Sequence, residues 1–94
     1  MLFEWDPRKN IINQFKHGIS FEEARQVFDD SLHLSFVDHR FTYFEERWIT
    51  IGAVKDTRLK VVAHISFTAT GEEVVRIISA REASTNERRQ YEEL

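Results

Sequence analysis

The last quarter of the chain contains arginines and one phenol in a pattern that could hold an anion. Arg76 lies inside a run of β-branched residues, and Arg81 follows the end of that run. A charge in or beside a buried strand needs a partner or a ligand, because removing an isolated charge from water is costly. Arg88 and Tyr91 come next, so these groups collect at one end of the predicted sheet. Arginine offers permanently charged, paired donors, which favours binding of an anion.

The spacing of Arg76 and Arg81 leaves open whether they reach one site. Five positions separate them. An ideal strand places residues at that spacing on opposite faces, so both reach one site only if the strand bends or ends before Arg81. The alternative is that Arg76 is structural and pairs with a carboxylate such as Glu46.

Two helices near the N-terminus are predicted to help position these residues. The first covers residues 7–17, with Asp6 as its cap and Gly18 as the left-handed residue that ends it. The second opens with a capping box of Ser20 and Glu23 and extends to about residue 28. We expect the apolar stripes of both helices to cover one face of the sheet. These stripes consist of Ile11, Ile12 and Phe15 on the first helix and Phe21, Ala24, Val27 and Phe28 on the second.

Alternation of apolar and polar residues predicts the strands. A short strand is expected at residues 2–5, and later strands at 32–38, 47–52, 59–67 and 74–78, with turns at 54–58 and 68–73. Residues 38–46 are mixed polar and aromatic, and we interpret them as an exposed loop. Ser84 and Glu87 form a capping box that starts a terminal helix. The pattern therefore predicts an α+β fold: a short N-terminal strand, two helices packed on an antiparallel meander of about four strands, and a C-terminal helix.

The composition limits the classes of function. A chain of 94 residues is expected to form a single domain spanning residues 1–94. Neither a signal-like N-terminus nor an apolar run of membrane-spanning length is present, so we expect a soluble cytoplasmic protein that contacts no membrane. The net charge is −3, from 13 basic and 16 acidic residues, which argues against a general nucleic-acid coat. A site for one phosphodiester needs only a local basic cluster.

Four groups of residues form a joint signature through their order and spacing. They are Phe3-Glu4-Trp5-Asp6; Lys16-His17-Gly18 followed by Ser20-Phe21-Glu22-Glu23-Ala24; Glu46-Arg47 before a strand ending in Ile51-Gly52; and Arg76-Ile77-Ile78-Ser79-Ala80-Arg81 followed by Glu87-Arg88-Arg89-Gln90-Tyr91-Glu92. With these residues, nearly the whole chain resembles the BrnT family of bacterial type II toxins, which share the RelE-like ribonuclease fold. Glu82, directly beside Arg81, departs from the pattern and adds a negative charge to the site.

The resemblance implies a ribonuclease toxin that cleaves RNA and blocks translation. It also implies a cognate BrnA-like antitoxin with a ribbon-helix-helix DNA-binding part, which neutralises the toxin in a hetero-oligomer. Such a toxin would touch DNA only through the antitoxin complex. The expected substrate is therefore RNA, and the expected activity is that of an endoribonuclease.

RNA cleavage without a metal ion proceeds by attack of the ribose 2′-hydroxyl on the adjacent phosphate, and it needs a base, an acid and cations. We predict catalytic roles for five residues: Arg76, Arg81, Arg88, Tyr91 and His64. Further RNA contacts are predicted at Lys16, His17 and Arg47. The four histidines lack metal-ligand spacing, so we expect no metal site and no cofactor.

Structural explanations compete with these roles. A single histidine on a strand, such as His64, is more often a structural residue than a proton shuttle. Tyr91 and Leu94 would pin a short amphipathic helix to the core, while Arg88 would pair with Glu92. For the whole chain, the alternative is a non-catalytic protein-interaction module that keeps a RelE-like fold. A DNA-binding regulator acting alone is disfavoured, because the charge is negative and no recognition helix is evident.

Overall fold

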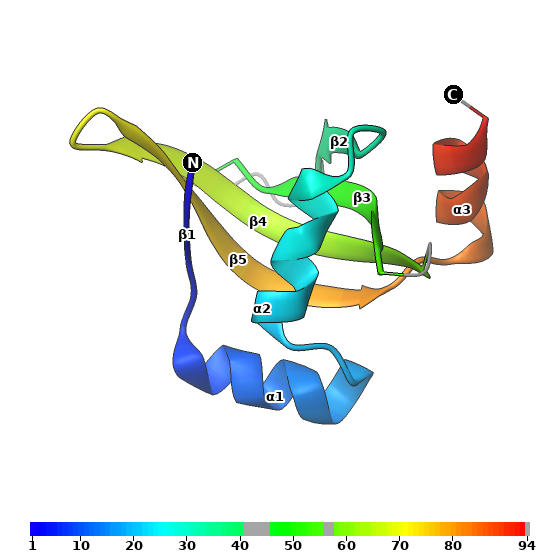
Figure 1. Cartoon of the computed structure of the whole chain (residues 1–94), viewed down its shortest axis with the longest axis horizontal. Coiled ribbons are helices and arrows are strands. Elements are labelled where there is room, and N and C mark those ends of the chain that lie inside the picture. Colours follow the sequence, from blue (N-terminus) through cyan, green and yellow to red (C-terminus); the bar gives the residue numbers. More distant parts are fainter. Residues whose placement is uncertain (41–45, 56–57, 94) are drawn as a thin grey trace.

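The computed structural model describes residues 1–40, 46–55 and 58–93. Its elements follow one another in the order β1 (Leu2–Glu4), α1 (Pro7–His17), α2 (Phe21–Ala24), the 3-10 helix η1 (Arg25–Asp29), β2 (Leu34–Val37), β3 (Trp48–Val54), β4 (Arg58–Ala69), β5 (Glu72–Glu82) and α3 (Thr85–Glu92). Figure 1 shows α2 across one side of a twisted sheet, α1 beyond the β5 edge of the sheet, and α3 near the far end of β5. Parts of the predicted loop at 38–46 and of the turn at 54–58, as well as Leu94, lie outside the described residues.

The five strands form one sheet in the order β1-β5-β4-β3-β2. Strands β2 to β5 make the predicted antiparallel meander. Strand β1, whose pairing was not predicted, is parallel to β5 with Glu4 opposite Arg76, so the five-stranded sheet as a whole is mixed and not purely antiparallel. The N-terminal strand covers part of the outer edge of β5, which would otherwise leave its backbone groups unpaired. The α+β class of the fold is confirmed.

The predicted caps of the helices are confirmed. Asp6 accepts a hydrogen bond from the Arg8 backbone N–H at 2.9 Å, and Gly18 ends α1 in the left-handed region with φ of 68°. Ser20 accepts from the backbone N–H of Glu23 at 3.0 Å. The second predicted helix is shorter than expected, because the chain tightens from α2 into η1 at Arg25.

The helical segment formed by α2 and η1 covers one face of the sheet, as its apolar pattern predicts. Phe21, Ala24 and Val27 are fully buried there, in a cluster that includes Val62 and Ile77. We call this side of the sheet the covered face. The opposite side carries a smaller cluster of Ile49, Ile51 and Val61, and we call it the open face.

Helix α1 differs from its prediction in the direction that its apolar stripe faces. Ile11 is 56% exposed, Ile12 51% and Phe15 88%, so the expectation that they cover the sheet is wrong. The buried residue of α1 is Asn13. Its amide donates to the carbonyl of Ala80 and accepts from the backbone N–H of the same residue, on the outer edge of β5. Helix α1 therefore closes a sheet edge through a polar side chain, and this contact turns its apolar stripe outward.

The hairpin between β4 and β5 is tighter than predicted. The strands run to Ala69 and from Glu72, so only Thr70 and Gly71 connect them, and both have positive φ. Such a two-residue turn matches the twist of the two strands. Among the described residues, no helix is long and apolar enough to cross a membrane.

Candidate functional site

A β-bulge in β5 decides which face of the sheet each arginine occupies. His64 on β4 pairs with Ile77, whereas its neighbour Ala63 pairs with Ser79. Ile78 is therefore an extra residue between two ladder pairs. An extra residue reverses the alternation of side chains beyond it.

The bulge brings Arg76 and Arg81 to the same face. Arg76 pairs with Ile65, and Arg81 pairs with Val61. These two partners lie four residues apart on β4, so they and the arginines opposite them share the open face. At the rise of a strand, the two arginine backbones lie roughly 13 Å apart.

Arg76 is held by a carboxylate, but not by the predicted one. Its Nη1 donates to Oε2 of Glu4 at 2.6 Å, and Glu46 does not take this role. Glu4 is the partner because β1 pairs in parallel with β5 and sets Glu4 directly opposite Arg76. The arginine side chain remains 40% exposed and the glutamate 43%. The bond uses one of the five guanidinium N–H donors, and the others can reach a ligand.

A hollow of about 550 Å³ lies at Arg76. Its lining combines the guanidinium with two carboxylates, two aromatic rings and a hydroxyl. The residues that line it are Glu4, Glu46, Trp48, Ile65, Ser66, Phe67 and Arg76. Glu46 is exposed and makes no hydrogen bond to the described residues. Glu46 is not among the catalytic or RNA-binding residues predicted from the sequence, although its place just before Arg47 in the family signature marks it.

Arg81 links the end of β5 to the start of α3 through an ion pair. Its guanidinium donates to both carboxylate oxygens of Glu87, at 2.7 and 2.9 Å. Glu87 also accepts from the backbone N–H of Ser84 and completes the predicted capping box. The hydrogen bonds from Arg81 lower the pKa of Glu87 to about 2, so this carboxylate stays charged. Arg81 is thus more tightly held than Arg76.

Asp38 and Arg40 add a second ion pair close to Arg81. Asp38 is 6% exposed and accepts from Nε and Nη2 of Arg40 at 2.9 and 2.8 Å, so for this residue the predicted exposed loop is wrong. The bonds from Arg40 hold the pKa of Asp38 below its usual range. The backbone carbonyl of Arg47, half-buried before β3, accepts from the Asp38 N–H at 2.7 Å. Sequence analysis missed Arg40, because it lies in the predicted loop.

Tyr91 anchors α3 to the body of the protein. Its ring packs against the open-face cluster, and its hydroxyl donates to Oδ2 of Asp30 at 2.5 Å. This hydrogen bond raises the pKa of Tyr91 to about 12. The geometry matches the pinning alternative for Tyr91. Arg88, one turn earlier, is exposed, and its charge helps to keep the pKa of Glu82 low.

Glu82 forms its salt bridge with a lysine and not with the neighbouring Arg81. Lys60, opposite Glu82 on β4, forms a salt bridge with it and is itself 4% exposed. The bond from Lys60 is the main cause that lowers the pKa of Glu82. The negative charge that departs from the family pattern is therefore compensated within the fold.

The structure does not bring His64 to the open face. His64 is 5% exposed on the covered face, where its Nε2 lies 2.7 Å from the hydroxyl of Thr50. Ser35 continues this chain with an Oγ-to-Oγ1 distance of 2.7 Å to Thr50. Burial lowers the pKa of His64 to about 4, so the ring is neutral near pH 7. Among the described residues, its Nδ1 has no hydrogen-bond partner.

Lys16 and His17 lie at the border between α1 and β5. Both are exposed in the last turn of α1. With Lys9 and Ser79 they belong to the lining of a hollow of about 170 Å³. Ser79 pairs with Ala63, so its side chain belongs to the open face. Lys16 and His17 are therefore close to the face that carries Arg76 and Arg81.

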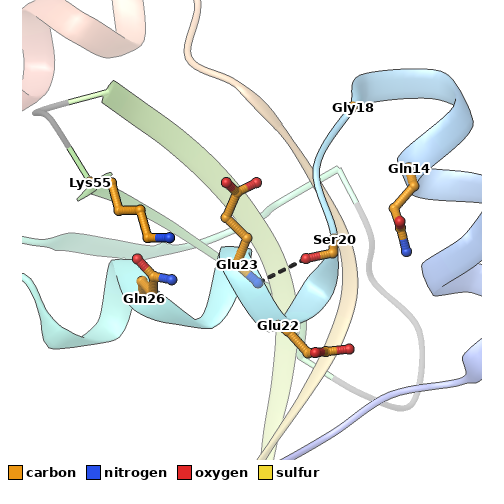
Figure 2. A pocket seen from close by; sticks show the side chains of 7 residues that line it. All are labelled: Gln14, Gly18, Ser20, Glu22, Glu23, Gln26 and Lys55. Atoms are coloured by element: carbon orange, nitrogen blue, oxygen red, sulfur yellow. Dashed lines mark hydrogen bonds between the residues drawn. The ribbon is translucent and has the colours of Figure 1, made fainter.

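A second large hollow, of about 530 Å³, holds none of the predicted site residues. Figure 2 shows its lining, in which Glu22, Glu23, Gln26 and Lys55 surround the start of α2. The dashed line marks the cap bond between Ser20 and Glu23. Within residues 1–40, 46–55 and 58–93, no group of three or more histidine or acidic side chains is arranged to hold a metal ion.

Comparison with known proteins relates this geometry to a family. Residues 5–87 match the family described as "Ribonuclease toxin, BrnT, of type II toxin-antitoxin system". The crystal structure of the Brucella abortus ribonuclease toxin BrnT shares the fold, with a TM-score of 0.62 and 24% identity over 90% of this chain and 100% of that chain. Among proteins with curated descriptions, none matches this sequence. Because the family match spans most of the chain, this protein belongs to the BrnT family of ribonuclease toxins of type II toxin-antitoxin systems.

Proposed function

We propose that this chain is an endoribonuclease that cleaves RNA at the hollow beside Arg76, by a reaction that needs no metal ion. One observation carries the proposal: the hollow joins a partly exposed guanidinium to an exposed carboxylate, Glu46, and to the ring of Trp48. The guanidinium can neutralise the phosphate, the carboxylate can act as the base for the ribose hydroxyl, and the ring can stack on a nucleobase.

The proposed reaction begins with a phosphodiester bound to the free N–H donors of Arg76. Glu46 accepts the proton of the ribose 2′-hydroxyl, and the resulting oxygen attacks the phosphorus atom. Arg76 neutralises the charge that develops on the phosphoryl oxygens. The bond to the 5′-oxygen breaks, and water in the open hollow gives that oxygen a proton. The products are a 2′,3′-cyclic phosphate and a free 5′-hydroxyl.

The remaining cations are proposed to hold the flanking RNA. Arg81, on the same face, would meet a neighbouring phosphate, and exposed Arg88 would extend the track along α3. Lys16 and His17 would bind the strand where it passes the edge of β5. Arg47 would act beside Glu46, at the start of β3. Phosphate contacts of this kind fix register and add a salt-dependent part to the affinity.

His64 and Tyr91, the other two predicted catalytic residues, fit positioning roles better than proton transfer. His64 is buried on the opposite face, and its pKa of about 4 makes it a weak base at neutral pH. The hydroxyl of Tyr91 is committed to Asp30. We propose that they hold β4 and α3 in place, so that substitutions there act through the position of the arginines.

We propose that residues 1–94 form one toxin domain with a RelE-like fold. We propose that this domain acts in the cytoplasm, where it blocks translation by cleaving RNA. Its family belongs to type II systems, in which an antitoxin partner is implied. We propose that this partner is a BrnA-like ribbon-helix-helix protein and that the toxin touches DNA only within the hetero-oligomer.

The test is cleavage of a synthetic single-stranded RNA by purified protein, with and without EDTA. We expect wild type to leave cyclic phosphate ends in both conditions, and Glu46→Gln and Arg76→Ala each to lower kcat about 100-fold or more. Glu22→Gln, in the hollow of Figure 2, is the matched carboxylate control and should keep full activity.

Three results would contradict parts of this proposal. Activity that EDTA abolishes would exclude metal-free chemistry. Unchanged cleavage by Glu46→Gln would remove Glu46 as the base. Intact RNA after incubation with wild type, together with a stoichiometric complex with the product of the neighbouring gene, would favour the non-catalytic interaction module.

A further inference from the structure

Helix α1 is attached to the protein by amide side chains instead of apolar ones. Asn13 donates from Nδ2 to the carbonyls of Ile19 and Ala80, each at 2.9 Å, and accepts from the Ala80 N–H at 3.1 Å. Asn10 accepts from the backbone N–H of Phe21 at 2.8 Å. These directional bonds fix the rotation of the helix about its axis. The outward direction of the opposite stripe therefore follows from the attachment itself.

The outward stripe is strongly apolar. Ile11, Ile12 and Phe15 follow the i, i+1, i+4 spacing of one helix side, and each is more than half exposed. Ile11 and Phe15 flank a shallow hollow of about 240 Å³ with Gln14. Neighbouring exposed apolar residues on one helix mark an interaction surface more often than isolated ones do. We call Ile11, Ile12 and Phe15 the outer stripe of α1.

The same helix is positively charged, although the chain as a whole is negative. Arg8, Lys9 and Lys16 all lie within Pro7–His17, and this helix contains no aspartate or glutamate. The formal net charge of the whole chain is −3. A partner that fits this helix therefore combines apolar side chains with carboxylates.

We propose that the outer stripe of α1, with Arg8 and Lys9, is the docking surface for an acidic amphipathic helix of the antitoxin. This inference rests on the proposed function for the identity of the partner. A helix of that kind would lay its apolar side on Phe15 and Ile11 and set its carboxylates against the cations. A second copy of this chain fits less well, because it would bring the cations of two α1 helices together. RNA bound at Lys9 and Lys16, in the hollow of about 170 Å³ that Ile12 also lines, would leave Ile11 and Phe15 exposed.

The test measures the affinity of the purified chain for the purified product of the adjacent gene, by isothermal titration calorimetry. Phe15→Asp should weaken binding about 100-fold or more, because it puts a carboxylate at the centre of the stripe. Leu32→Asp is the matched control: Leu32 is 66% exposed but lies away from α1, and its variant should bind within about threefold of wild type.

Charge reversal tests the second half of the proposal. The double variant Arg8→Glu with Lys9→Glu should bind about tenfold or more weakly and should lose the salt dependence that wild type shows. Lys55→Glu, an exposed cation at the hollow of Figure 2, should leave both quantities unchanged.

Each alternative predicts its own result. Unchanged affinity of Phe15→Asp for the partner would overturn the proposal. A dimer of wild type that becomes a monomer in Phe15→Asp, with partner affinity retained, would assign the stripe to a second copy. Loss of RNA cleavage with retained partner binding would assign it to RNA. If Phe15→Asp lowers Tm, the double variant Ile11→Gln with Ile12→Gln decides the case, and full partner affinity in it overturns the proposal.

The binding measurement is independent of catalysis. If wild type cleaves no RNA but Phe15→Asp still loses the partner, the docking surface stands and the proposed enzymatic function fails. If wild type cleaves RNA and Phe15→Asp keeps the partner, the opposite holds.

Discussion

The two faces of the sheet hold their polar groups in different ways. On the covered face, Thr50 and His64 are buried and joined by a hydrogen bond of 2.7 Å, and burial keeps the ring of His64 neutral near pH 7. On the open face, Arg76 and Arg81 are permanently charged, and each pairs with a glutamate while about 40% of its side chain stays exposed.

This difference separates stability from ligand binding. Exposed ion pairs contribute about 0–1 kcal/mol each, because water and salt screen them. Errors of packing in a closed core cost about 1–3 kcal/mol or more. Substitutions on the covered face should therefore act mainly on folding, whereas substitutions at the open-face arginines should act mainly on RNA.

The largest expected effect is that of Gly52→Ala on the covered face. A Cβ at position 52 would lie 2.7 Å from the carbonyl oxygen of Val27 and 2.8 Å from its Cβ, so η1 would have to move away from β3. We expect the free energy of unfolding to fall by about 3 kcal/mol. Urea denaturation followed by circular dichroism measures it.

Gly71→Ala serves as the control for this substitution. Gly71 has φ of 80° but no atom near the added Cβ, so only the backbone conformation is strained, at about 1 kcal/mol. Equal losses in the two variants would show that the contact between η1 and β3 yields easily, which would contradict the expectation that packing errors on the covered face are costly.

A smaller change in the free energy of unfolding is expected when the pH is lowered. One pH range reports on His64 of the covered face, and a lower pH range reports on Glu87 of the open face. Unfolded His64 takes up a proton near pH 6.5, but the folded protein takes it up only near 4, so stability falls as the pH drops between these values. Glu87 ionises near 4.5 when unfolded and at about 2 when folded, so its contribution is complete above 4.5 and is lost toward pH 2. The loss at buried His64 should be on the order of 2 kcal/mol. The loss at Glu87, which belongs to an ion pair at the surface, should be about 1 kcal/mol or less.

Substitutions identify the residue that causes the loss of stability in each pH range. His64→Gln should remove the dependence between pH 6.5 and 4, while His17→Gln, an exposed histidine on α1, should keep it. Glu87→Gln should reduce the pH dependence of stability between pH 4.5 and 2. Thermal unfolding from pH 7 to 2 gives the measurement, and a loss of stability between pH 6.5 and 4 that persists in His64→Gln would show that another group is responsible.

The features that were predicted correctly depend on residues close to one another in the chain. The caps at Asp6, Gly18, Ser20 and Ser84 need only neighbours within a few residues, and all four are confirmed. The meander also follows from short connections between sequential strands.

What the sequence predicted poorly depends on distant parts of the chain. The stripe of Phe15 looks like a core stripe until the edge of β5 offers a backbone site to Asn13, 67 positions from Ala80. The pairing of Arg76 with Glu4 spans 72 positions and follows from a parallel strand that periodicity does not reveal. The bulge at Ile78, which sets Arg76 and Arg81 on one face, is likewise a property of the pairing with β4. The proposed role of Glu46 could be inferred only once the hollow was assembled.

The smallest expected effect on stability is that of Glu4→Gln, and it sharpens the comparison. Glu4 competes with a phosphate for Arg76 on the open face, so removing its charge should lower KM for RNA about threefold, while the free energy of unfolding changes by about 0–1 kcal/mol. Glu72→Gln, which removes an exposed carboxylate 3.9 Å from the N-terminal amine, should change neither quantity. A rise in KM for Glu4→Gln would mean that the ion pair positions Arg76 for RNA rather than competing with it. The open face would then resemble the covered face, where a hydrogen bond with Thr50 holds His64 in place.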